Sequence, residues 1–200
     1  MPEFIDIAGC NAAGKSSFIR SRISQLENFE VIMTDVYKGR TREIYKRALK
    51  EKKNIILETV FNDNSFKDLI DEARNAGYHT SMIVLFLDSP RHSIDRVAYR
   101  SIEQNGLIIS GNNILLNFNE SFKNIATCFF YFNQCDFIYT GITGENTLIM
   151  NFQQAALVSY KSSNLRYPQQ FAEYSFSRQR LNETAFNIIR SNEDYDVPQN

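Results

Sequence analysis

The residues with the most specific chemistry lie near the N-terminus. Residues 9–16 read Gly-Cys-Asn-Ala-Ala-Gly-Lys-Ser, a full match to the pattern G-x-x-x-x-G-K-[ST]. In such a loop the glycines let the backbone turn its N–H groups toward one concavity, which holds phosphate oxygens. The Lys15 ammonium would reach the outer phosphates of a nucleotide, and the Ser16 hydroxyl would ligate Mg²⁺. We therefore predict a phosphate-binding loop formed by Gly9, Asn11, Ala12, Ala13, Gly14, Lys15, Ser16 and Ser17.

Three carboxylates follow apolar runs that read as strands. Ligands of a parallel α/β sheet bind at the carboxyl ends of its strands, so these residues are candidates for the same site. Asp35 is interpreted as a base for a hydroxyl nucleophile, with a helix N-cap or a loop residue as the alternative. Glu58 ends a buried run, where an idle carboxylate is costly, and we expect it to contact substrate or metal. Asp88 is either a magnesium ligand or a helix cap, and the sequence Asp-Ser-Pro favours the cap.

Two arginines lie one turn apart on a predicted helix over residues 91–104. Arg96 and Arg100 share a face of that helix. If this face points at the phosphate loop, the two side chains would neutralise charge on a transferring phosphoryl group. The alternative is a solvated helix face. His79 and His92 have no partner at ligand spacing, and we interpret both as surface residues.

These candidates are positioned by strands that alternate with helices along the chain. This alternation predicts an α/β fold, with a mainly parallel sheet and helices on both faces. The segment 105–117, rich in glycine and asparagine, is predicted to be a mobile flap or lid, and 153–200 to hold one or two helices and a frayed polar tail. The predicted strands cover residues 3–8, 29–33, 54–60, 81–87 and 136–140, with an edge strand at 147–152. One predicted helix begins at residue 15, and the others cover residues 40–52, 65–76, 91–104 and 118–132.

Composition and charge argue against several classes of protein, among them nucleic-acid binders and disulfide-rich or membrane-spanning proteins. The 200 residues are 43% hydrophobic, enough for one core, and the net charge of −1 argues against a nucleic-acid binder. Three cysteines without a C-x-x-C pair argue against a disulfide framework or a structural zinc site. No apolar run reaches the length of a membrane span, and the start MPEFIDIAG lacks a signal-peptide profile, so we expect a cytoplasmic protein. We expect a core over 1–150 and a C-terminal extension over 151–200, packed on the same domain.

The motifs together resemble those of the zeta-toxin-like P-loop kinases, over about residues 3–140. The loop is similar to that family's G-P-N-G-A-G-K-S-T, and Glu58-Thr59 is similar to its E-T. Further similar segments follow in the family's order: ARNAGY at 73–78, SPRHSIDRVAYR at 89–100 and SFKNI at 121–125.

The resemblance implies a three-layer P-loop NTPase fold of the kinase type and ATP-dependent phosphorylation of a small-molecule hydroxyl. In the best-known members the acceptor is UDP-N-acetylglucosamine. ATP and Mg²⁺ are the implied cofactors, and an antitoxin protein is an implied partner beside the small-molecule substrate. Carried over by position, Lys15 and Ser16 hold phosphates and Mg²⁺, Asp35 is the base, Glu58 and Thr59 face the substrate, and Arg96 and Arg100 stabilise the transferring phosphate.

The sequence departs from the family in the region of the lid. The family's G-G-H-x-V-P segment reads here as Asn105-Gly106-Leu107 and Ile109-Ser110, without the histidine or the proline. Its arginine pair falls at Leu116 and Asn117, and Lys123, a point charge, would replace it poorly. Its Asp-Asn-Ser is Tyr139-Thr140-Gly141. Either the acceptor differs or catalysis is weak, so the alternative function is a nucleotide-binding switch or slow ATPase without phosphotransfer.

Overall fold

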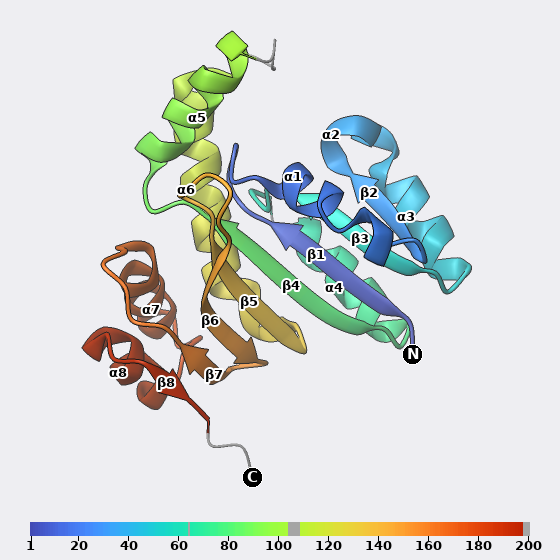
Figure 1. Cartoon of the computed structure of the whole chain (residues 1–200). Helices are drawn as coiled ribbons and strands as arrows, with labels where there is room; N and C mark the ends of the chain where they lie inside the picture. Colours follow the sequence, from blue (N-terminus) through green and yellow to red (C-terminus); the bar gives the residue numbers. More distant parts are fainter. Residues whose placement is uncertain (64, 104–108, 198–200) are drawn as a thin grey trace.

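The computed structural model describes residues 1–63, 65–103 and 109–197. These residues form one eight-stranded sheet with the order β2-β3-β1-β4-β5-β6-β7-β8 (Figure 1). The first five strands in this order pair in parallel and the last three pair antiparallel. The strands are β1 Glu3–Ala8, β2 Phe29–Met33, β3 Asn54–Thr59, β4 His79–Phe86, β5 Gln134–Tyr139, β6 Thr147–Gln153, β7 Ala156–Tyr160 and β8 Tyr195–Asp196.

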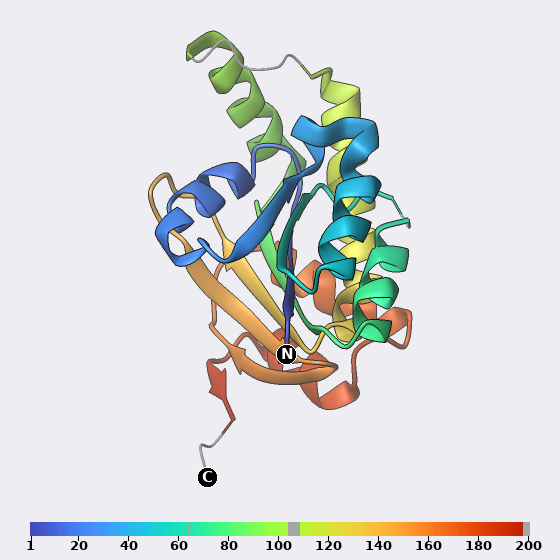
Figure 2. The same cartoon turned by 90° about the vertical axis from the view of Figure 1, so that its right-hand side faces the viewer.

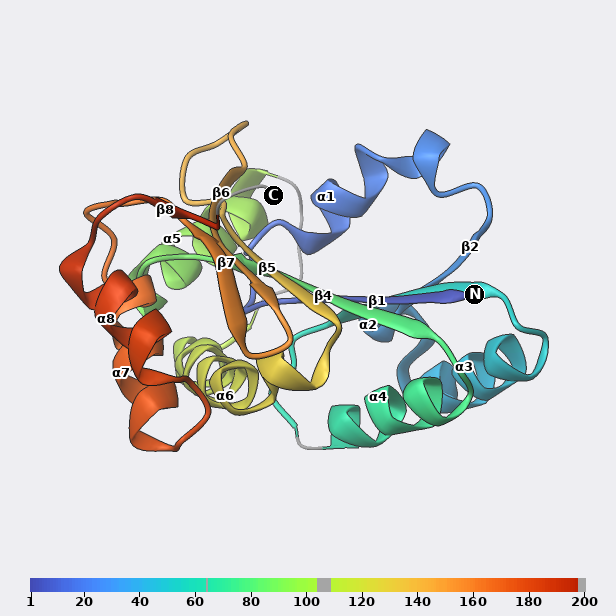
Figure 3. The ribbon, with the colours of Figure 1, turned by 90° about the horizontal axis from the view of Figure 1, so that it is seen from below.

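Helices cover both faces of the sheet, which confirms the predicted α/β class. Seen from below, α1 lies on one face, and α3, α4 and α6 lie on the other (Figure 3). The helices are α1 Lys15–Arg20, α2 Thr34–Tyr37, α3 Thr41–Lys50, α4 Ser65–Asn75, α5 Pro90–Glu103, α6 Gly111–Cys128, α7 Tyr167–Ser177 and α8 Glu183–Ser191, with 3₁₀ turns η1 Ile23–Gln25, η2 Lys38–Arg40 and η3 Phe129–Tyr131.

The central strands are buried on both faces because their apolar residues are contiguous. In β3, Ile55, Ile56 and Leu57 are all within 1% of full burial, as expected for a strand covered on two sides. β1 lies between β3 and β4, so the segment that follows β1 emerges in the middle of the sheet. The chain adds β2 and β3 on one side of β1 and then β4 and β5 on the other. Ligands of such doubly wound sheets bind at the point where the direction of winding switches.

The predicted flap is partly helical. Residues 111–117 form the first two turns of α6, where Ser110 is the N-cap and its side chain accepts from the Asn113 N–H. Asparagine is common in loops, but a serine cap followed by an apolar stripe is a helix start, and here the helix forms. The remainder of the predicted flap, 105–108, lies outside the described residues. In Figures 1 and 2, α5 and the start of α6 project beyond the sheet.

The C-terminal region contains strands that the sequence analysis missed. β6 is not an edge strand, because β7 pairs with it and β8 pairs with β7. The turn between β6 and β7 places Gln154 at φ 54°, without the glycine or asparagine that usually marks such a turn. The polar tail is therefore ordered in part, and β6 crosses the predicted boundary at residue 150.

No helix in the described ranges is long and apolar enough to cross a membrane.

Candidate phosphate-binding site

The loop over residues 9–14 joins β1 to α1 at the carboxyl edge of the sheet. Gly9 is required there, because a Cβ at this position would collide with the carbonyl oxygen of Leu85 on β4. Gly14 has φ 91° and Ala12 has φ 57°, so the backbone alternates between right- and left-handed conformations. Such alternation turns successive N–H groups to one side and makes an anion-binding concavity.

Three consecutive carbonyls of the loop accept hydrogen bonds from side chains of other elements. Ser93 and Arg96 lie on α5, and Thr140 directly follows β5. We call these three side chains the loop brace. The contacts are Ser93 Oγ to Asn11 O at 2.6 Å, Arg96 Nη1 to Ala12 O at 3.4 Å, and Thr140 Oγ1 to Ala13 O at 2.8 Å.

Most N–H groups of the loop have no acceptor among the described residues, and the exception is Ala13, which donates to the Cys10 carbonyl at 3.3 Å. No described group accepts a hydrogen bond from the N–H groups of Asn11, Ala12, Gly14, Lys15 or Ser16. Unpaired backbone donors are costly unless water or a ligand accepts from them. A row of free donors beside a lysine ammonium is the arrangement that binds phosphate oxygens.

Lys15 closes over its own loop. Its Nζ donates to the carbonyl oxygens of Gly9 at 2.9 Å and Cys10 at 3.1 Å. Burial lowers the pKa of this ammonium, whereas the carboxylates of Glu58 and Asp35 raise it. The ammonium is therefore held by two neutral carbonyls and two nearby carboxylates, and phosphate oxygens could replace the carbonyls.

Glu58 and Ser16 form an oxygen-rich corner beside the loop. The Ser16 hydroxyl lies 3.0 and 3.2 Å from the two Glu58 oxygens, and Glu58 is only 7% exposed. The described residues contain no group of three or more Cys, His, Asp or Glu that would cage a metal. One hydroxyl and one carboxylate fit Mg²⁺, which keeps several waters and takes its other ligands from phosphates.

Asp35 lies at the same edge of the sheet. In the β2–β3 register Met33 pairs with Glu58. Asp35 lies in α2, two residues after Met33, and therefore just beyond that pair. Its side chain is exposed, and α2 has no side-chain cap. The exposed carboxylate is therefore accessible to an acceptor approaching the loop from solvent.

Thr59 points away from this corner. Neighbouring strand residues face opposite sides of a sheet, so Glu58 and Thr59 cannot share one face. The Thr59 hydroxyl is fully buried and donates to Asp6 Oδ1 at 2.9 Å. Desolvation raises the pKa of Asp6 from 3.8 to about 7, and its Oδ2 has no partner among the described residues. Contact of Thr59 with a substrate stays a prediction that this geometry does not support.

The two arginines of α5 differ in their surroundings. Arg96 donates from Nη2 to the Thr140 carbonyl at 2.6 Å as well as to Ala12, so its guanidinium lies between the loop and the end of β5. Arg100 is exposed, and its charge lowers the pKa of Lys15. Arg100 thus contributes positive potential at the loop, and Arg96 contacts the loop backbone.

Asp88 is bound to a helix terminus. Its Oδ1 accepts from the N–H groups of Arg166 at 2.6 Å and Tyr167 at 2.9 Å, where α7 begins. Ser89, not Asp88, accepts from His92 at the start of α5. The predicted cap thus belongs to a helix almost eighty residues away.

A bridge of three asparagine side chains was not predicted. Asn117 Nδ2 donates to Asn11 Oδ1 at 2.8 Å, and Asn62 Nδ2 donates to Asn117 Oδ1 at 2.7 Å. The bridge joins the phosphate loop, the start of α6 and the segment after β3. Its members are scattered through the sequence, so no local pattern could have found it, and Asn117 occupies one of the two positions where the resemblance places arginines.

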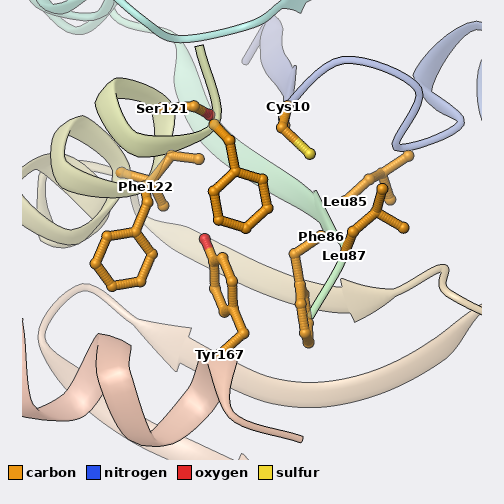
Figure 4. Close-up of a pocket in the computed structure, with 10 residues that line it drawn as sticks. Cys10, Leu85, Phe86, Leu87, Ser121, Phe122 and Tyr167 are labelled. Atoms are coloured by element: carbon orange, nitrogen blue, oxygen red, sulfur yellow. The ribbon is translucent and has the colours of Figure 1, made fainter. Parts of the chain in front are cut away.

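Beneath the loop lies a cavity of about 10 Å³, lined mostly by apolar side chains (Figure 4). Cys10 enters it from the loop, and the stacked rings of Phe86 and Tyr167 lie below. This volume suits at most one water molecule. The cavity is therefore packing beneath the site, and phosphate would bind on the opposite, solvent-facing side of the loop.

The comparisons with known proteins agree with this architecture. A model of the family "Zeta toxin" matches residues 39–134, from η2 to the first residue of β5. The match leaves out the phosphate loop and Asp35. No curated protein sequence matches the chain.

Solved structures match nearly the whole chain at low identity. One is from the PezAT chromosomal toxin-antitoxin system of Streptococcus pneumoniae, with a TM-score of 0.57, 13% identity, and coverage of 90% of this chain and 86% of that one. Another is from the AvrRxo1-ORF1:AvrRxo1-ORF2 complex with sulphate ions, with a TM-score of 0.59, 8% identity, and coverage of 96% and 75%. A structure of that complex with ATP has a TM-score of 0.55, 9% identity and the same coverage. The family match over residues 39–134 and the shared fold agree with the resemblance seen in the motifs: over that segment the chain is similar to the zeta-toxin family, and its fold is similar to that of these solved structures.

Proposed function

We propose that this protein is an ATP-dependent small-molecule kinase, which transfers the γ-phosphoryl group of ATP to a hydroxyl. The observation that carries the proposal is the loop over residues 9–14, where the N–H groups of Asn11, Ala12 and Gly14 have no described acceptor while three carbonyls are held by side chains of other elements. The zeta-toxin-like fold supports it, and so does the structure of the AvrRxo1-ORF1:AvrRxo1-ORF2 complex with ATP, which has the same fold.

Phosphate binding requires one side chain to move. Lys15 would leave the carbonyls of Gly9 and Cys10 and donate to β- and γ-phosphate oxygens instead. Ser16 and Glu58 would hold Mg²⁺ at the adjacent corner. When bound there, Mg²⁺ would supply positive charge against the phosphate oxygens. The Ser16 hydroxyl proton, now directed at Glu58, would have to turn away from the metal.

Asp35 would act as the base. Its carboxylate would accept the proton of the acceptor hydroxyl as that oxygen forms a bond to the γ-phosphorus. The bond between the γ-phosphorus and the β–γ bridging oxygen breaks, and ADP leaves with the electron pair. Lys15 and Arg100 would offset the charge on the transferring group, the role also predicted for Arg96. Thr59 would act only by holding the end of β3 through Asp6.

The acceptor and the partner are the finer parts of the proposal. UDP-N-acetylglucosamine is the first acceptor to test, because the motifs resemble those of kinases that use it. An antitoxin protein is the partner to test, because the PezAT structure comes from a toxin-antitoxin system. One observation favours the alternative of a nucleotide switch or slow ATPase: neutral Asn117 is engaged with Asn11 and Asn62 where the resemblance places an arginine.

The test is a phosphoryl-transfer screen. Pure protein would be incubated with Mg-ATP, UDP-N-acetylated sugars and a metabolite extract, and mass spectrometry would detect any species that gains one phosphoryl group. Lys15→Ala should abolish both ATP binding and product. Asp35→Asn should lower the transfer rate by about 10²- to 10⁴-fold and leave ATP affinity nearly unchanged. The exposed Asp68→Asn on α4 is the matched control.

Each outcome of the screen has a defined meaning. Product that disappears in both variants would support the kinase and name the acceptor. ATP binding without any product would favour the switch or slow ATPase. Absence of ATP binding in the wild-type protein would refute the phosphate loop as a nucleotide site.

A further inference from the structure

The loop brace joins the phosphate loop to two distant parts of the chain. Ser93 and Arg96 belong to α5, and Thr140 directly follows β5, the strand on the far side of β4 from β1. Each of the three side chains donates to a different carbonyl, and the carbonyls are consecutive along the loop. We propose that Thr140, together with Ser93 and Arg96, positions the phosphate loop so that its N–H groups face the bound phosphates. The proposal rests on the proposed function.

The geometry of the peptide unit explains how a brace on carbonyls can orient N–H groups. In a trans peptide the C=O of one residue and the N–H of the next point in opposite directions. Holding the Asn11 carbonyl outward therefore turns the Ala12 N–H inward. Holding the Ala13 carbonyl outward likewise turns the Gly14 N–H inward. These two N–H groups are among those without a described acceptor.

Thr140 is the residue on which the brace depends most. Its hydroxyl lies 2.8 Å from the Ala13 carbonyl and 3.3 Å from that of Phe86, and its own carbonyl accepts from Arg96 Nη2 at 2.6 Å. Thr140 is 5% exposed, so water would replace these contacts poorly. A buried acceptor that loses its donor destabilises the folded state by more than the hydrogen bond itself contributes.

The same contacts assign Arg96 a positioning role. Nη1 and Nη2 both donate to backbone carbonyls, one in the loop and one in Thr140. Arg96 thus links α5 to the loop and to the end of β5, and acts on phosphate through the loop. Arg100 lies one turn further along α5 and is exposed. Of the two arginines it is therefore the one whose side chain could approach the phosphoryl group during transfer.

The experiment compares Thr140→Val with Thr140→Ser. Valine keeps the volume and removes the hydroxyl, whereas serine restores the hydroxyl. Affinity for Mg-ATP and for pyrophosphate would be measured by calorimetry, with the melting temperature recorded alongside. Thr127→Val on α6 is the matched control, because the described contacts of its hydroxyl are all within its own helix: the carbonyls of Lys123 and Asn124 and the sulfur of Cys128.

We expect Thr140→Val to weaken both ligands about tenfold, because a smaller fraction of the protein has a competent loop. Thr140→Ser should bind within about twofold of the wild type, and Thr127→Val should bind normally. Ser93→Ala should resemble Thr140→Val through a different carbonyl. Unchanged affinity in Thr140→Val, or failure of serine to restore it, would overturn the proposal.

A second measurement works without nucleotide. Backbone order parameters of the Ala12 and Gly14 amides should be near 0.85 in the free wild-type protein and below 0.6 in Thr140→Val. If these values do not differ, the brace does not position the loop, even if ATP binds. If they differ as expected but the wild-type protein binds no nucleotide, the brace stands and the proposed function fails. Should Thr140→Val not fold, Ser93→Ala is measured in its place.

Discussion

Replacing Asp6 by asparagine should make the protein more stable at alkaline pH and little different at acid pH. Asp6 lies in the middle of β1, is fully buried, and has an oxygen without a partner among the described residues. Desolvation raises its pKa to about 7, while the Thr59 hydroxyl and the Lys15 ammonium lower it. In the unfolded chain this carboxyl would titrate near 3.8.

The magnitude follows from the difference between the two pKa values. Moving from 3.8 to about 7 corresponds to about 4 kcal/mol, at about 1.4 kcal/mol per pH unit. Because the folded pKa is the higher one, the folded state binds more protons, and stability falls as pH rises from about 4 through about 7. Above pH 8 the wild-type protein carries the whole cost of a buried carboxylate. That cost is a large part of a typical free energy of unfolding of about 5–15 kcal/mol.

Urea unfolding at pH 5 and pH 8.5 would test this reasoning. Asp6→Asn should raise the free energy of unfolding by up to about 4 kcal/mol at pH 8.5 relative to the wild type, with an unchanged dependence on urea. At pH 5 Asp6 is neutral in the folded state but still loses its proton on unfolding, so the gain should shrink to about 1.7 kcal/mol. The exposed Asp68→Asn should show no such pH dependence. An equal effect of Asp6→Asn at both pH values, or an Asp6 carboxyl that titrates near pH 4 by NMR, would refute it.

Three further predictions concern the site. Gly9→Ala should lower the free energy of urea unfolding by several kcal/mol, because the new Cβ meets the Leu85 carbonyl. Gly39→Ala, with open space around it, is the control, and equal free energies of unfolding for the two variants would contradict the prediction. Glu58→Gln should raise the Mg²⁺ concentration needed for half-maximal ATP binding and impair acceptor use, and an unchanged Mg²⁺ titration would place Glu58 off the metal. Asn117→Leu should weaken ATP binding about three- to tenfold by breaking the bridge to the loop, and calorimetry showing full affinity would make the bridge dispensable.

Much of the fold could be predicted because local patterns encode it. The buried parallel strands have contiguous apolar residues, as in Ile55–Leu57, and their helices begin and end at recognisable signals such as Gly77, at φ 80°. The β6–β7 turn at Gln154 and the two-residue β8 lack such signals. Their pairing depends on neighbouring strands that sequence periodicity does not describe, and both were missed.

The sequence by itself determined the turn of the loop over residues 9–14, because Gly9 and Gly14 impose its backbone geometry locally. It also placed Glu58 at the end of a strand and Asp35 just after one, since position relative to a strand is a local property. Only the tertiary structure decided what the other side chains contact. Thr59 turns into the core because strand neighbours alternate in direction, and Asp88 caps α7 because that helix begins beside the end of β4.

The same reason explains the loop brace and the asparagine bridge. Thr140 reaches Ala13, and Asn117 reaches Asn11, across more than a hundred residues of sequence. A hydrogen bond depends on distance and direction in space, which one sequence does not contain. Residue types therefore predicted which groups would bind phosphate, and the packing of α5, α6 and β5 around the loop decided which groups hold the loop in place.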